Sequence, residues 1–143
     1  MMAFEPVPAK DVLLQQPPFV FIDRIVHYDD SVTGIQYRVP ENGLLVEDGS
    51  LCASGMMEHM AQSMAAREGY VSHYILHIPI RLGMLGQIKN FSLYRHARSG
   101  ELLETTVRLT HEMMGISLAE ITVCCQGETV AEAIIKTVIT NEE

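Results

Sequence analysis

Two polar side chains have the types and the spacing for acid–base chemistry. Glu58 and Gln62 lie four residues apart, so on a helix they would lie on adjacent turns, about 40° apart around the axis. A carboxyl group can exchange a proton with a reacting group, and an amide on the next turn can orient it by a hydrogen bond. This pair is therefore the candidate catalytic pair. Alternatively, Glu58 faces solvent near a helix start, where the helix dipole favours negative charge.

The helix that must position this pair is predicted from the spacing of apolar residues. One stripe recurs at the i, i+3, i+4, i+7 and i+8 positions. It consists of Met57, Met60, Ala61, Met64 and Ala65. Ser54 is the expected N-cap, and Gly69 is expected to end the helix in a left-handed conformation. We therefore expect one long, buried helix over Met56 to Tyr70.

The segments around this helix alternate with the period of a β-strand. A short helical turn at residues 11–16 precedes the first of them. The expected strands are residues 19–28, 32–39, 80–94, 101–112, 116–125 and 129–140. A helix with a broad apolar face and only one sheet available must be wrapped by that sheet. The sequence thus predicts an α+β fold, with a long central helix wrapped by a five- to six-stranded antiparallel sheet.

Composition sets the class of protein. The chain has 143 residues, of which 48% are hydrophobic and 20% charged, and we expect one globular domain over residues 1–143. Neither a signal peptide nor a run long enough to span a bilayer is evident, which predicts a cytoplasmic protein that does not enter the membrane. Three cysteines, two of them adjacent, argue against a disulfide framework or a four-cysteine zinc site.

The charge distribution is uneven. The net charge of −8 argues against nucleic acid as a partner. Residues 69–100 nevertheless contain no acidic residue, although they contain Arg81, Lys89, Arg95 and Arg98. A basic face on an acidic protein suits an anionic ligand or an acidic partner. The alternative is chance clustering of solvated charges.

Two histidines have a spacing that metal ligands sometimes use. His73 and His77 lie four residues apart, but no acidic residue completes a His-Glu-x-x-His pattern, and no third ligand is near in the sequence. We therefore expect surface histidines and no metal site.

Three motifs resemble the 3-hydroxyacyl-[acyl-carrier-protein] dehydratases of the hotdog fold. Residues 13–25, which read LLQQPPFVFIDRI, resemble the turn and Asp-Arg strand that open those enzymes. Residues 58–62, EHMAQ, match their central-helix Glu-x-x-Ala-Gln pattern. Residues 127–133, GETVAEA, resemble their closing strand. The three motifs occur in the family's order and span most of residues 13–140.

The resemblance implies a hotdog fold and a site for dehydration of carrier-bound thioesters. In that family the helix Glu is the catalytic carboxylate and the Gln supports it, which assigns these roles to Glu58 and Gln62. The substrate is carried on the phosphopantetheine of an acyl carrier protein, and no other cofactor is implied. Each active site of the family lies at a dimer interface and takes its histidine and its acid from different subunits. A homodimer, or a heterodimer with a second hotdog subunit, is therefore expected.

One departure from the family pattern bears on catalysis. The loop that carries the family's histidine corresponds to residues 42–53, which contain no histidine. Together with residues 83–86, GMLG, this loop resembles the dehydratase-like subunits of aryl-polyene and related pigment pathways. If the chain acts alone, another base must replace the histidine, and the candidates are Glu47, Asp48 and His96. The alternatives are a non-catalytic carrier-binding subunit and an acyl thioesterase.

The resemblance also suggests what the remaining candidate residues do. Backbone amides near Gly55 and Met56 are expected to polarise the thioester carbonyl, because helix N-termini bind developing negative charge. Ser54 and Met57 complete the expected substrate contacts. The helix methionines either line an acyl tunnel or belong to the plain core. The four basic residues of 69–100 are expected to dock the acidic carrier protein.

Overall fold

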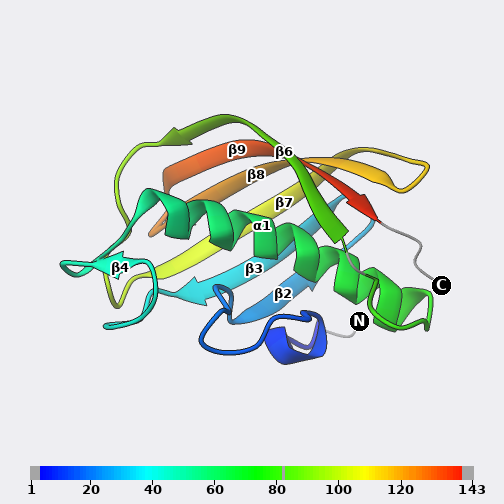
Figure 1. Cartoon of the computed structure of the whole chain (residues 1–143), viewed down its shortest axis with the longest axis horizontal. Coiled ribbons are helices and arrows are strands. Elements are labelled where there is room, and N and C mark those ends of the chain that lie inside the picture. The colour runs from blue at the N-terminus through cyan, green and yellow to red at the C-terminus, as the bar shows by residue number, and fades with distance from the viewer. Residues whose placement is uncertain (1–3, 82, 140–143) are drawn as a thin grey trace.

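The computed structural model describes residues 4–81 and 83–139. Leu82 and Thr140, which belong to two predicted strands, and the remaining ends of the predicted domain lie outside the described residues. Helix α1 (Ala53–Tyr70) lies lengthwise along one face of a large antiparallel sheet (Figure 1). This is the predicted α+β hotdog arrangement.

The main sheet has the strand order β1-β2-β3-β7-β8-β9-β6. Its six long strands are β2 (Arg24–Tyr28), β3 (Val32–Arg38), β6 (Gly83–Leu93), β7 (Leu102–Met113), β8 (Ile116–Cys125) and β9 (Glu128–Ile139). The shorter elements are β1 (Val7–Pro8), the 3₁₀ turn η1 (Ala9–Asp11), β4 (Val46–Glu47), β5 (Ser50–Leu51) and the π-helical turn η2 (Val71–Ile75). The chain leaves α1 and returns as β6 at the far edge, beside β9.

The first predicted strand is shorter than its composition suggested. It begins at Arg24 and not at Phe19, because side chains of α1 take the backbone groups before it. Gln62 accepts a hydrogen bond from the amide of Phe21 at 2.7 Å and donates one to the carbonyl of Phe19 at 2.8 Å. The predicted helical turn at 11–16 is also displaced, since η1 ends at Asp11.

The central helix ends at Tyr70 as predicted, but both predicted capping residues were wrong. The N-cap is Cys52, without a side-chain capping bond, and the exposed Ser54 lies inside the first turn, its Oγ 3.1 Å from the Cys52 Sγ. At the other end, α1 passes through Gly69 and continues into η2. Gly69 serves packing and not termination, because a Cβ there would lie 1.9 Å from the carbonyl oxygen of Val12.

We therefore expect Gly69→Ala to destabilise the fold. In an unobstructed helix this change would stabilise by about 0.5–1 kcal/mol, but here the new methyl group meets backbone that cannot move away cheaply. Chemical denaturation should show a free energy of unfolding about 1–3 kcal/mol lower. Gly55→Ala is the matched control, because its closest obstacle is the end of the flexible Leu51 side chain, at 2.6 Å. If Gly69→Ala lowered the free energy of unfolding by no more than Gly55→Ala does, the packing role of Gly69 would be contradicted.

The buried face of α1 is rotated from the predicted stripe. Met60 and Met64 are buried as expected, but Met57, Ala61 and Ala65 are only partly buried. Besides methionines, the buried face of α1 carries polar and small side chains, among them His59, Ser63 and Ala66. Hydrophobicity alone could not indicate this face, because buried polar groups are stable only where they find hydrogen-bond partners.

Strand β6 forms one edge of the sheet and leaves apolar side chains exposed. Met84 and Leu85 are 56% and 50% exposed, although Leu85 pairs with Thr137 of β9. Its ladder is interrupted near Gly86 and again between Lys89 and Ser92. No helix of the described part of the chain is long and apolar enough to cross a membrane.

Candidate functional site

A cavity of about 200 Å³ lies beside α1, and the candidate pair lines it. The helix contributes Glu58, Ala61, Gln62, Met64, Ala65 and Glu68 to its wall. The opposite wall comes from residues 12–15 and from the segment that leads into β6. Of the helix methionines, Met64 lines this cavity, but Met56, Met60 and Met64 all belong to the buried core. This favours the plain-core interpretation of the methionines.

Gln62 holds the carboxyl group of Glu58 in place. Its Nε2 donates to the Glu58 Oε2 at 3.0 Å, so the predicted hydrogen bond is present. Glu58 is half-buried. Because Gln62 occupies one oxygen of the carboxyl group, Glu58 keeps the other for a ligand. The catalytic role of the pair remains a prediction.

The amide of Gln62 is itself fixed by the chain that opens the fold. Its side chain is 1% exposed, and both of its polar atoms bond the Phe19–Phe21 backbone. These bonds fix which end of the amide carries the NH₂ group, since only Oε1 can accept from the Phe21 amide. The NH₂ group is therefore directed at Glu58. The opening motif and the helix motif of the sequence thus form one hydrogen-bonded unit.

His59, the neighbour of Glu58, belongs to the core. It is fully buried, its Nδ1 lies 2.7 Å from the Phe21 carbonyl oxygen and its Nε2 lies 2.7 Å from the Thr105 hydroxyl. Its ring stacks on Tyr37 with centroids 5.2 Å apart. Burial lowers the pKa of His59 to about 4, against a smaller upward contribution from the Phe21 carbonyl. Neutral His59 donates from Nδ1 and accepts at Nε2, so it has no free nitrogen to act as a base.

The predicted substrate contacts at the helix start lie outside this cavity. The structure does not place Ser54, Gly55, Met56 or Met57 in its lining. The Met56 amide donates to the Cys52 carbonyl at 3.0 Å, so it already lies within the helical ladder. The Gly55 amide precedes this ladder, and no hydrogen bond to it is found among the described residues. Substrate contact by Ser54, Gly55, Met56 and Met57 stays a prediction.

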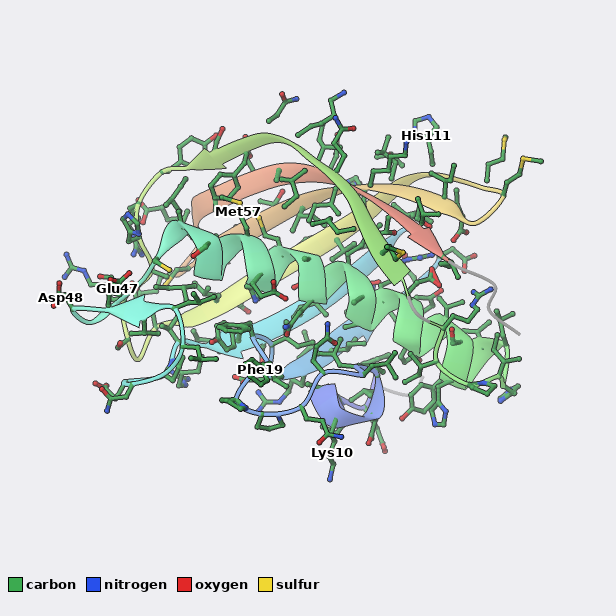
Figure 2. The ribbon with its side chains drawn as sticks, viewed as in Figure 1. Lys10, Phe19, Glu47, Asp48, Met57 and His111 are labelled. Carbon is green, nitrogen blue, oxygen red and sulfur yellow. The ribbon has the colours of Figure 1, made fainter. Side chains whose placement is uncertain are left out.

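The proposed replacement bases are not in this cavity. Glu47 and Asp48 project from the β4–β5 hairpin at the far end of the molecule (Figure 2), and neither they nor His96 line the cavity. The His96 Nδ1 lies 3.0 Å from the Leu51 carbonyl oxygen. Among the described residues of one chain, the cavity lining includes the Glu58 carboxylate and its partner Gln62, but no histidine.

The predicted basic surface is partly neutralised. Arg95 forms ion pairs with Glu101 at 3.0 Å and Glu128 at 3.1 Å, and Arg81 lies 3.4 Å from Glu68. These acids come from outside residues 69–100, so counting charges along that segment missed them. Lys89 and Arg98 are exposed and have no ion pair among the described residues.

The two spaced histidines lie within and just after η2. His73 lies in η2, where it packs edge-on against Tyr74 at a centroid distance of 4.6 Å, and His77 has a φ of +54°. Among the described residues, no group of three His, Cys, Asp or Glu side chains is arranged to hold a metal ion.

The family comparison bears directly on this site. The ApeP-like family, described as ApeP dehydratase, matches residues 7–143. The chain belongs to this family. The match includes all three motifs and confirms the predicted resemblance to the dehydratases of the aryl-polyene type. A search of curated proteins gave no match.

Solved structures support the fold. The dehydratase heterocomplex ApeI:P from Xenorhabdus doucetiae matches with a TM-score of 0.86 at 20% identity, over 95% of this chain and 93% of that chain. A Streptococcus mutans protein bound to acetyl-CoA has a TM-score of 0.69 at 14% identity, over 92% and 98%. A hypothetical thioesterase with coenzyme A from Streptococcus pneumoniae has a TM-score of 0.66 at 12% identity, over 83% and 86%.

Proposed function

We propose that this ApeP-like protein is a dehydratase subunit that supplies Glu58 to a composite active site. The substrate is a 3-hydroxyacyl thioester carried by an acyl carrier protein, and the histidine comes from a second hotdog subunit. The observation that carries the proposal is the cavity in which Gln62 orients Glu58 and which has no histidine in the described lining. The name of the heterocomplex ApeI:P, a similar structure, supports a partner of this kind.

The proposed reaction divides the proton transfers between the two subunits. The histidine of the partner removes the proton α to the thioester carbonyl, and Glu58 donates a proton to the 3-hydroxyl group as the C–O bond breaks. The products are the 2,3-unsaturated thioester and water. The carboxyl group needs a fixed direction for this step, and the hydrogen bond from Gln62 provides it.

The exposed edge of β6 is where the second subunit would pair. An unpaired edge of eleven residues with exposed apolar side chains is unfavourable in a free chain. Gly83 and Leu85 of this strand also line the Glu58 cavity. A subunit paired along β6 would therefore bring its own side chains close to Glu58.

We further propose that Lys89 and Arg98 contribute to carrier-protein docking. The double change Lys89→Glu with Arg98→Glu should weaken carrier binding by about 0.5–2 kcal/mol at low salt, because two exposed charge pairs become repulsive. Titration of the carrier at low and high salt measures this loss, which should shrink as salt rises. Lys10→Glu is the control, since Lys10 projects from the opposite side of the molecule from β6 (Figure 2). Unchanged affinity in the double variant would mean that both charges are only solvated.

The proposed function is tested by reconstitution. The chain is assayed alone and as a mixed complex, that is, together with a histidine-bearing hotdog subunit, on 3-hydroxyacyl and on plain acyl carrier thioesters. We expect dehydration by the mixed complex and little by the chain alone. Hydrolysis of the plain acyl thioester would instead identify a thioesterase. Carrier binding that leaves the partner's dehydration rate unaffected would identify a non-catalytic subunit.

A further inference from the structure

The cavity beside Glu58 has a second polar end, which the proposed reaction does not use. Glu68 lines it ten residues after Glu58, about 15 Å further along the helix axis. Arg81 lines it as well, and its Nη2 lies 3.4 Å from the Glu68 Oε2. The rest of the lining is mostly apolar and includes Leu13, Ala61, Met64, Ala65 and Leu85, together with the polar side chains of Gln15 and Thr137.

Glu68 is held firmly in this position. Its side chain is 7% exposed, and its other oxygen lies 3.3 Å from Nη1 of the buried Arg67. Burial raises the pKa of Glu68, while the neighbouring Arg67 and Arg81 oppose that shift. Arg67 in turn lies 3.7 Å from Glu112 on β7. The carboxyl group of Glu68 is thus a fixed acceptor at the cavity wall.

Arg81 is less well satisfied than Glu68. Its contact with Glu68 is long for a hydrogen bond, and its Nε is buried with no hydrogen-bond partner among the described residues. A buried donor without an acceptor is unfavourable, and more so when it carries charge. Its side chain is still 31% exposed, so part of it remains accessible to a ligand. A ligand that offers an acceptor would complete this site.

The charges at this end restrict what that ligand group can be. A methyl end would bring more apolar surface against Arg81 and Glu68 and leave the guanidinium donors without an acceptor. A carboxylate end would meet the Glu68 carboxylate and be repelled by it. A hydroxyl group can accept from Arg81 and donate to Glu68 at the same time. The pair therefore fits a neutral hydroxyl group best.

We propose that Arg81 is a specificity-determining residue, which together with Glu68 binds a hydroxyl group at the far end of the acyl chain. This inference rests on the proposed function, because it assumes that the acyl chain runs along α1 from its thioester end at Glu58. It also gives Arg81 a different role from the carrier docking expected from the sequence.

The test compares two stable ligands that cannot be dehydrated or hydrolysed. They are acyl-pantetheine amides of equal chain length, one ending in a methyl group and the other in a hydroxyl group, titrated calorimetrically into the mixed complex. We expect the wild-type complex to prefer the hydroxyl-ended ligand by about 10- to 100-fold. Arg81→Met should remove the preference, and Arg81→Lys, which keeps a charged donor, should retain part of it. Lys10→Met, a change at an exposed lysine outside the cavity lining, should leave the preference unaltered.

Each outcome separates this inference from the function on which it rests. Equal binding of both ligands by the wild-type complex, or an undiminished preference in folded Arg81→Met, overturns the role of Arg81. Dehydration and its dependence on Glu58 are measured separately, so they can stand in either case. No binding of either ligand would contradict the acyl site itself. Thermal unfolding of each variant establishes that a lost preference does not come from a lost fold.

Discussion

Replacing Glu58 by glutamine should lower the dehydration rate of the mixed complex by about 10²- to 10⁴-fold, the usual contribution of a catalytic acid or base. The glutamine side chain has nearly the same shape as the glutamate that it replaces, and its amide oxygen can still accept the hydrogen bond from Gln62. What is lost is the proton for the leaving hydroxyl group. Single-turnover measurements with a 3-hydroxyacyl carrier thioester give the chemical step directly.

The control for this change is Glu120→Gln. Glu120 is an exposed carboxylate of β8 and does not line the Glu58 cavity, so its replacement should leave the rate unaltered. A mixed complex that dehydrates at the wild-type rate with Glu58→Gln would show Glu58 to be a surface carboxylate near the helix start.

The stability of the chain should fall steeply between pH 6.5 and pH 4 because of His59. Its pKa is lowered to about 4 in the folded state, whereas an unfolded histidine titrates near 6.5. Between these values the unfolded chain binds a proton that the folded chain does not, so stability is fully present above 6.5 and is lost as the pH falls. The loss should be about 2 kcal/mol between pH 8 and pH 5.

Urea unfolding of the wild type and of His59→Gln at several pH values isolates this contribution. Glutamine can also donate and accept a hydrogen bond in the core, but it does not titrate in this range. The variant should be less stable at pH 8 and should lose less stability on acidification. Parallel pH profiles for the two proteins would mean that His59 does not remain neutral in the folded chain.

Local patterns made the sheet and the contact between Glu58 and Gln62 predictable. The alternation of β7, β8 and β9 reflects which side chains face the helix, and the four-residue spacing of Glu58 and Gln62 fixes their contact within one helix. The family match of residues 7–143 includes these segments. Such local features can be predicted from the sequence without knowing which distant residues are in contact.

What the sequence did not show depends on partners far along the chain. Gly69 is required by the Val12 carbonyl, and the buried face of α1 includes His59 because Phe21 and Thr105 supply its hydrogen bonds. The charge of Arg95 is offset by acids that follow the basic segment. Most of these pairings join residues far apart in the sequence, and Glu101, although only six residues from Arg95, lies beyond the intervening turn. The periodicity and local charge of one segment could not reveal them.

The proposed composite site requires the histidine from the partner and the acid from this chain. One measurement can test this requirement. If each site takes its histidine and its acid from different subunits, only one of the two sites in the mixed complex is complete: the one that pairs the partner's histidine with Glu58. The measurement is the dehydration rate of a mixed complex in which the partner's own helix acid is replaced by glutamine, while Glu58 is intact. We predict a rate close to that of the unaltered mixed complex. Loss of dehydration in that complex would contradict the account, because the working acid would then belong to the partner and not to this chain.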